Sequence, residues 1–148
     1  MIPKLPDYDD LSSEAYNHPK YFNISEAVLA DFGLAEKIDE TLNHAIVGTP
    51  FWMAPEVLNE KGYNHLADIF SLGIVLCELI ARKSADPDEL PRTNEFGLDT
   101  QAFKKLSKDS MCPKSLRKLA IKMCNIKPEK RPLLTEIVDK LTSIALFL

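Results

Sequence analysis

Gly48-Thr49-Pro50-Phe51-Trp52-Met53-Ala54-Pro55-Glu56 is the stretch that decides the fold, together with an earlier triplet, Asp31-Phe32-Gly33. The two motifs bracket residues 34–53, which we expect to form one long loop. Loops of this length inside a compact domain are usually functional or lack a fixed structure. Residues 55–59 should follow as a short helix, because proline is favoured at the first position of a helix.

Nearly all of the chain after residue 55 is expected to be helical. Residues 66–82 are apolar almost all round, which is typical of a buried helix, and they carry one narrow polar stripe. The stripe consists of Asp68, Ser71, Glu78 and Arg82. Residues 84–94 contain two prolines and three acidic residues, which indicates a loop. A short helix is expected within residues 99–106.

Two amphipathic helices complete the predicted fold. Residues 113–125 place apolar side chains at helical spacing on one face, and a turn at residues 127–132 follows. The last helix begins at about residue 134. The two apolar faces are formed by Leu116, Leu119, Ala120 and Met123, and by Ile137, Leu141, Ile144 and Leu148. Arg117, Lys118 and Lys122 are expected on the opposite face of the first of these helices.

The N-terminal part of the chain differs from the rest. Residues 1–25 contain helix-breaking prolines and acidic residues without an apolar period, so we expect an irregular tail. Residues 26–30 are expected to form a short strand that leads into Asp31. Residues 26–148 are then interpreted as one partial domain.

Composition limits the classes of function. The 148 residues carry a formal net charge of −4, which gives no general reason to expect nucleic-acid binding. No apolar run approaches the ~20 residues that span a bilayer, and the N-terminus does not resemble a signal peptide. The three cysteines lack disulfide-framework or zinc-site spacing, so we expect free thiols in a reducing compartment. The expected location is the cytoplasm, with the nucleus as the alternative.

From about residue 29 onward, the chain resembles the C-terminal lobe of a eukaryotic protein kinase. Four motifs occur in the order typical of that family. They are Asp31-Phe32-Gly33, Ala54-Pro55-Glu56, Asp68-Ile69-Phe70-Ser71-Leu72-Gly73 and Arg131-Pro132. The resemblance implies a mainly α fold, the helical C-terminal lobe of a kinase, behind an irregular N-terminal tail.

A finer resemblance is to the branch that holds LIM kinases and testis-specific dual-specificity kinases. It rests on the sequences of residues 31–38 and 74–82, and above all on the Pro/Asp-rich loop at residues 85–93, which continues to residues 96–99. That loop is not generic to kinases. The testis-specific side of the branch is the closer fit.

The resemblance assigns roles to the first motif and to the loop. Asp31 would hold Mg²⁺ that bridges the ATP phosphates, because a hard cation prefers carboxylate oxygen. Asp31-Phe32-Gly33 as a whole would face the cofactor, with Phe32 packed inward and Gly33 allowing the turn. Without the resemblance, Asp31 would be a solvated turn aspartate.

Within the loop, Thr41 and Thr49 are candidate phosphorylation sites. Thr49 and Pro50 belong to the substrate-facing part of the loop, in a context that resembles serine/threonine kinases. Trp52 is expected to be a packing anchor at the base of the loop.

Three further residues have structural roles by resemblance. Glu56 and Arg131 are expected to form a buried salt bridge, although they could also be two unrelated surface charges. Asp68 holds the catalytic loop in the family. Because that loop is missing from this sequence, Asp68 should find another donor or face water.

The sequence contains no His-Arg-Asp motif, no recognisable glycine-rich loop and no Val-Ala-Ile-Lys strand. Only 30 residues precede Asp31, too few for these parts, so we assign no catalytic residue and expect no phosphoryl transfer by this chain alone. ATP and Mg²⁺ are the cofactors by resemblance, and protein substrates or regulators of a parent kinase are the partners. The alternatives are a non-catalytic interaction module and the product of an incomplete gene. Self-association through an uncovered apolar face is also expected.

Overall fold

A computed structural model describes Ala30, Gly33 and residues 50–146. The chain divides into two compact units, Met1–Ala35 and Glu36–Leu148. The architecture given below is that of the second unit. The expected tail at residues 1–25, and all but Ala30 of the expected strand at residues 26–30, lie outside the described residues.

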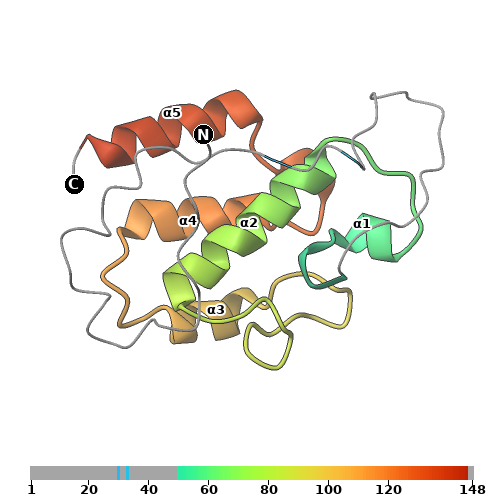
Figure 1. The fold of residues 1–148 in the computed structure, drawn as a ribbon, viewed down its shortest axis with the longest axis horizontal. Coiled ribbons are helices and arrows are strands. Elements are labelled where there is room, and N and C mark those ends of the chain that lie inside the picture. The colour runs from blue at the N-terminus through green and yellow to red at the C-terminus, as the bar shows by residue number, and fades with distance from the viewer. Residues whose placement is uncertain (1–29, 31–32, 34–49, 147–148) are drawn as a thin grey trace, which may run out of the picture. The chain divides into compact units, whose positions relative to one another are not determined.

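Residues 50–146 are mainly helical, as the sequence predicted (Figure 1). The elements in chain order are η5 (Pro50–Trp52), α1 (Pro55–Leu58), α2 (Leu66–Ala81), α3 (Thr100–Leu106), α4 (Lys114–Met123), η6 (Pro128–Lys130) and α5 (Leu134–Ala145). The predicted helices are all present in this part of the chain: α1 to α4 begin and end within two residues of the expected positions, and α5 begins at residue 134 as expected. In this part of the chain, the one β pairing is an isolated antiparallel bridge between Arg92 and Leu98.

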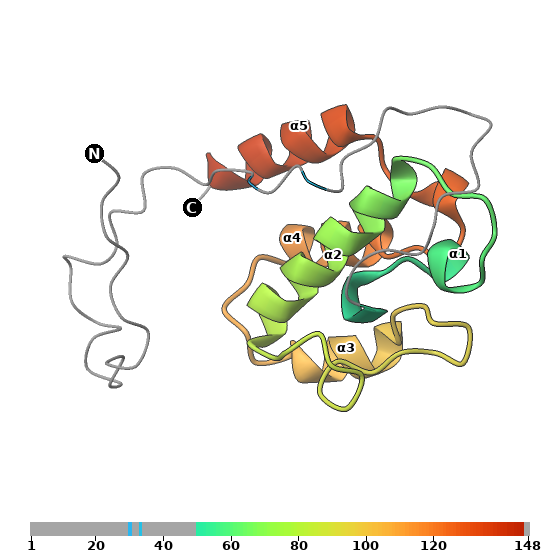
Figure 2. The ribbon, with the colours of Figure 1, turned by 45° about the vertical axis from the view of Figure 1, so that its right-hand side comes forward.

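Helix α2 is the centre of this unit. It packs against α4, and both views show it between α3 and α5 (Figures 1 and 2). Phe70, Ile74 and Cys77 on α2 are fully buried. Gly73 allows the close approach of α4, because a Cβ atom there would lie 2.7 Å from the Cys124 sulfur.

The prediction that α2 is buried apart from one polar stripe was wrong, because a row of apolar side chains on this helix is exposed. Leu72, Val75 and Leu79 are 41%, 39% and 69% exposed and form a continuous row along the helix, here named the α2 stripe. By contrast, Ser71 and Glu78 are half-buried and hydrogen-bonded. The reason is that α4 covers one side of α2 and leaves the α2 stripe uncovered. Ser71 and Glu78 instead point toward η5, where Ser71 donates to the Trp52 carbonyl and Glu78 accepts from the Trp52 indole N–H.

The remaining helices begin where the sequence provides a cap or a proline. The Asp99 carboxylate accepts hydrogen bonds from the backbone N–H groups of Gln101 and Ala102, each at 3.0 Å, and so caps α3. The carboxylate of Glu136 accepts from the Leu133 N–H at the start of α5.

The predicted face of α4 is correct: Leu119, Ala120 and Met123 are buried. One residue of the opposite face differs, because Arg117 is half-buried and donates to the Ser110 hydroxyl at 3.3 Å. In α5, Ile137 is buried, while Leu141 and Ile144 are half-buried. Leu148 lies outside the described residues.

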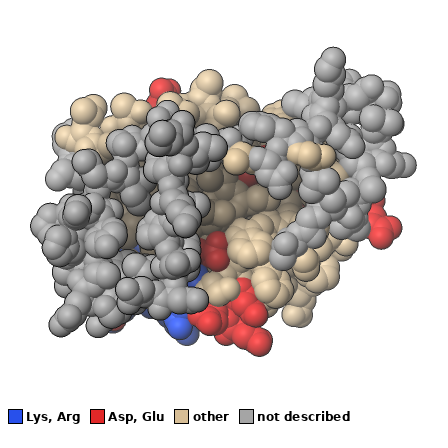
Figure 3. All heavy atoms as spheres, viewed as in Figure 1, with Lys and Arg blue, Asp and Glu red and all other residues tan. Residues whose placement is uncertain are grey.

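The surface seen in Figure 3 is mostly neutral in the middle, and acidic side chains gather at its lower edge. The exposed acidic residues of the loop after α2 include Asp88 and Glu89. No helix within the described ranges has the length and apolarity needed to cross a membrane.

Candidate functional site

The C-terminal end of the predicted loop folds as a 3-10 turn, η5, which leads into α1. In η5, the Met53 N–H donates to the Pro50 carbonyl at 3.1 Å. Met53 and Ala54 are then buried, and Pro55 occupies the first turn of α1. Pro50 itself is exposed. The chain therefore enters the core directly after the segment that the sequence marked as substrate-facing.

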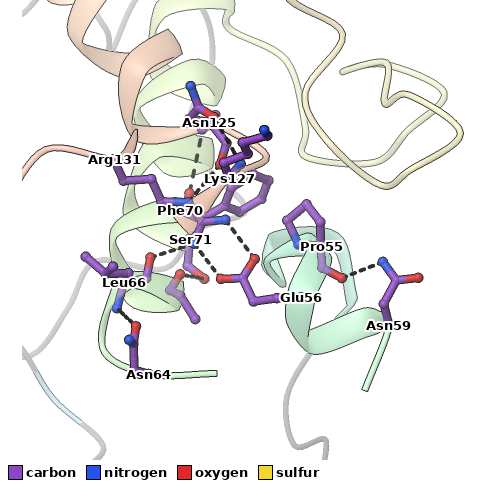
Figure 4. Close-up of polar contacts among 12 residues, drawn as sticks. Pro55, Glu56, Asn59, Asn64, Leu66, Phe70, Ser71, Asn125, Lys127 and Arg131 are labelled. Atoms are coloured by element: carbon purple, nitrogen blue, oxygen red, sulfur yellow. Dashed lines mark hydrogen bonds and ion pairs between the residues drawn. The ribbon is translucent and has the colours of Figure 1, made fainter. Parts of the chain in front are cut away.

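Glu56 and Arg131 form the predicted ion pair, and it is bidentate (Figure 4). Arg131 Nη1 lies 2.5 Å from Glu56 Oε1, and Nη2 lies 2.7 Å from Oε2. The Arg131 side chain is 0% exposed and that of Glu56 is 9% exposed. Two parallel charge-assisted hydrogen bonds of this kind are strong and geometrically specific.

Arg131 also satisfies two backbone carbonyls. Its Nη1 donates to the Leu66 carbonyl at 2.8 Å, and its Nε donates to the Asn125 carbonyl at 2.8 Å. The first acceptor begins α2 and the second follows α4 (Figure 4). One guanidinium thus ties α1 to the start of α2 and to the α4–α5 turn, which makes this buried charge well satisfied.

Trp52 does more than the packing that the sequence predicted. Its indole N–H donates to Glu78 Oε2 at 2.7 Å, and the Ser71 hydroxyl donates to its backbone carbonyl at 2.8 Å. The other carboxylate oxygen, Glu78 Oε1, accepts from the Ala85 N–H at 2.7 Å. Glu78 therefore joins the η5 turn to the loop after α2.

Arg92 makes a second connection between the same two segments. Its Nη2 donates to the Phe51 carbonyl and its Nη1 donates to the Phe96 carbonyl, the latter at 3.4 Å. Burial lowers the pKa of Arg92 below the ordinary arginine value. Even so, a guanidinium stays charged at neutral pH.

Both arginines lie over the ring of Phe70. The guanidinium carbon of Arg131 is 5.0 Å from the ring centroid and that of Arg92 is 5.6 Å from it. Phe70 is fully buried, so this cation–π contact is shielded from water. The Phe70 ring thus packs against both guanidinium groups: that of Arg131, which contacts the α4–α5 turn, and that of Arg92, which contacts the η5 turn.

Asp31, Phe32, Thr41 and Thr49 lie outside the described residues. Asp68 is exposed at the start of α2. Of the two expected outcomes, another hydrogen-bond donor or contact with water, the structure therefore shows contact with water. Across residues 50–146, together with Ala30 and Gly33, no group of three His, Cys, Asp or Glu side chains could hold a metal ion.

The sequence reasoning missed Glu78 and Arg92 as site residues. Glu78 had one usable signal, since a carboxylate inside the apolar run of α2 needs a hydrogen-bond partner. Arg92 had none, because its acceptor Phe51 lies 41 residues earlier in the sequence.

A groove of about 580 Å³ lies at the other end of α2. Its walls include Leu79, Leu106, Met111 and Leu116, and none of its lining residues belongs to the ion pair or to the η5 connections. The groove is mainly apolar and is open to solvent beside the α2 stripe.

Comparison with known proteins gives consistent matches. The model of the protein kinase domain matches residues 22–141. The chain is 50% identical over 139 residues to Dual specificity testis-specific protein kinase 2 of Mus musculus, covering 91% of this chain and 24% of that protein. It is 54% identical over 123 residues to Dual specificity testis-specific protein kinase 1 of Homo sapiens, covering 78% of this chain and 19% of that protein. The chain therefore spans about a quarter or less of the length of these relatives.

Proposed function

Because this chain belongs to the protein kinase family, we propose that it forms the rear, helical part of a domain that transfers the γ-phosphoryl group of ATP to protein serine and threonine hydroxyls. Its relatives are named dual-specificity kinases, and we propose tyrosine as a second acceptor to test. The supporting observation is the Glu56–Arg131 pair; because Arg131 also donates to the Leu66 carbonyl, it fixes α1, directly after the proposed substrate-facing loop, to the start of α2. Phosphoryl transfer depends almost wholly on positioning and electrostatics, so firm attachment of the segment that ends this loop suits the task.

Protein kinases generally use ATP with Mg²⁺. We assign the contact with the ion to Asp31 on its motif, because Mg²⁺ in such sites binds one or two carboxylates together with phosphate oxygens. The other residues of the nucleotide side, Phe32 and Gly33, are assigned on the same motif. What the described residues contribute is the placement of residues 50–54, which lead directly into α1.

The 148 residues contain no His-Arg-Asp aspartate and no ATP-anchoring lysine motif. The proposed activity therefore requires those parts from elsewhere. A chimera tests this directly: residues 30–146 replace the matching segment of Dual specificity testis-specific protein kinase 2 from Mus musculus, which supplies the rest of the domain. Transfer of radiolabel from γ-labelled ATP to a peptide library with Ser, Thr and Tyr acceptors is the readout.

We expect the chimera to transfer label and its Asp31→Asn variant to lose transfer. The Lys104→Ala variant, which changes an exposed side chain of α3, is the matched control and should keep full activity. A chimera that melts like the parent kinase but transfers no label would contradict the proposed function.

A second candidate function is a non-catalytic interaction module that associates with its own copy through the α2 stripe. Leu72, Val75 and Leu79 follow a heptad spacing, and the same row continues to Asp68 at one end and Arg82 at the other. Two antiparallel copies of α2 would place Asp68 opposite Arg82 at both ends, with the apolar residues between them. The groove beside Leu79 has room for a leucine from the second copy.

This surface is small, since α2 has 16 residues and is about 24 Å long. We therefore expect a weak dimer rather than an obligate one. Analytical ultracentrifugation should show that the chain alone dimerises with rising concentration. The chimera should stay monomeric, because the restored part of the domain covers the stripe. A chain that is monomeric at every concentration would contradict self-association.

In the cell, we propose a cytoplasmic location. The described cysteines Cys77, Cys112 and Cys124 are all free thiols, which supports a reducing compartment. Fractionation of cells that express a tagged chain would test this, and recovery in a secreted fraction would contradict it.

A further inference from the structure

Arg92 belongs to the segment between α2 and α3, residues 84–98, which is here named the Arg92 loop. We propose that Arg92 is a positioning residue for the substrate-facing loop: it holds the η5 turn at the orientation in which a protein substrate docks. The proposal rests on the proposed function, because docking has meaning only in a complete kinase domain. It assigns a role to a part of the chain that lies outside the ATP and metal motifs.

The end of the Arg92 loop is built as a rigid turn. Arg92 and Leu98 form a bridge, the Thr93 N–H donates to the Gly97 carbonyl at 2.7 Å, and the Asp99 N–H donates to the Pro91 carbonyl at 2.9 Å. Phe96 adopts a positive φ of 63°, which a bulky residue rarely does. Such strain persists only where the surrounding structure holds it, and it is concentrated at functional sites.

This turn directs the guanidinium of Arg92 toward the η5 segment. One nitrogen donates to the Phe96 carbonyl within the turn, and the other donates to the Phe51 carbonyl across 41 residues of sequence. The stacked contact with Phe70 restricts the remaining freedom of the side chain. Lysine cannot reproduce this arrangement, because a single ammonium lacks the planar fork that reaches two carbonyls while it stacks.

Glu78 forms a second connection between the η5 turn and the Arg92 loop. Its carboxylate accepts from Trp52 in the turn and from Ala85 in the Arg92 loop. Phe51 and Trp52 are therefore held by two independent ties that lead to the same loop. A displacement of the Arg92 loop would consequently move the residues that directly follow Thr49 and Pro50.

The first experiment uses the chain itself. Trp52 is its single tryptophan, so the fluorescence emission reports on the η5 turn alone. Arg92→Ala should shift the emission to longer wavelength and increase quenching by acrylamide. Arg92→Lys, which keeps the charge, should give a smaller change in the same direction.

Arg117→Ala is the matched control. Arg117 is also half-buried with a buried Nε that lacks a hydrogen-bond partner within the described residues, but it lies on α4 and donates to Ser110. Its loss should lower the melting temperature without changing the Trp52 signal. An unchanged Trp52 signal in folded Arg92→Ala and Arg92→Lys would overturn the proposal.

The second experiment separates positioning from mere stability. In the active chimera, Arg92→Lys should raise KM for the peptide substrate about tenfold, the effect of one lost hydrogen bond from a charged group, and leave KM for ATP unchanged. Equal changes in both constants, or in neither, would overturn the positioning role. If the unsubstituted chimera is inactive, the proposed function fails, while the fluorescence result still decides whether Arg92 holds the turn.

Discussion

The carboxylate of Glu56 and the guanidinium of Arg131 meet across 75 residues of sequence, and they join α1 to the turn between α4 and α5. Both groups are buried, and Arg131 additionally serves the carbonyls of Leu66 and Asn125. This one relationship links the sequence motifs, the fold and the proposed function.

Loss of Arg131 should strongly destabilise the chain. Arg131→Ala leaves the Glu56 carboxylate buried without its cation, so we expect the free energy of unfolding to fall by ~3–5 kcal/mol. Chemical denaturation monitored by circular dichroism measures it. The neighbouring exposed residue provides the control, and Lys130→Ala should change the free energy by less than about 0.5 kcal/mol.

A double variant sharpens this test. Glu56→Gln combined with Arg131→Met removes both charges, so it should be more stable than Arg131→Met alone. Two substitutions whose effects simply add would show that the two residues do not interact.

Gly73 should not tolerate even a methyl group. An alanine Cβ would lie 2.7 Å from the Cys124 sulfur and 2.8 Å from the Met123 Cβ, which forces α2 and α4 apart. Alanine is the better helix former by about 1 kcal/mol, but overpacking costs roughly 1–3 kcal/mol, so we expect a net loss of stability.

Gly62→Ala is the control for Gly73→Ala, because nothing lies within 4 Å of the added Cβ there. Thermal unfolding of the two variants gives the comparison. A Gly73→Ala melting temperature at or above that of the parent chain would show that the helices are not in close contact at this position.

The dimer proposed for the α2 stripe predicts a charge-reversal pattern. Asp68→Arg places two arginines opposite each other at each end of the pair and should raise the dimer dissociation constant roughly fivefold. Asp68→Arg combined with Arg82→Asp restores opposite charges and should restore the affinity. Sedimentation of the three chains at low ionic strength measures this, and equal dissociation constants in all three would rule out the antiparallel arrangement.

Cys77 should make the chain sensitive to alkaline pH. A hydrogen bond with Cys124, together with burial, raises the pKa of the Cys77 thiol above its ordinary value of 9.0. The folded state thus binds the proton more tightly than the unfolded state does. The stability that this provides is complete below pH 9 and is lost as the pH rises above it, at about 1.4 kcal/mol per pH unit.

Urea unfolding at pH 7, 9 and 10 checks this dependence. Cys77→Ala should be less stable at pH 7, because it leaves a cavity, but its stability should fall less steeply above pH 9. Identical slopes in the two chains would mean that the Cys77 thiol is not responsible.

The sequence predicted the helices well because their signals are local. Asp99 marks the start of α3 as an N-cap, and the spacing of Leu119, Ala120 and Met123 marks the buried face of α4. The Glu56–Arg131 pair was also predictable, since both residues stand in recognisable motifs. The described residues place it as expected.

What the sequence could not predict is which side of α2 is covered. That helix is apolar almost all round, so its pattern does not distinguish Ile74, which is buried, from Val75, which is exposed. The roles of Glu78 and Arg92 were hidden for another reason. Their partners, Trp52 and Phe51, lie 26 and 41 residues away, and no periodic pattern encodes such pairings.

The rate of label transfer by the chimera, compared with that of the isolated chain at equal concentration, tests the central claim most directly. The account predicts transfer by the chimera at a rate within about tenfold of the parent kinase, because the loop end and its scaffold are intact, and none by the chain alone. Transfer by the isolated chain, or a folded chimera without any transfer, would contradict it.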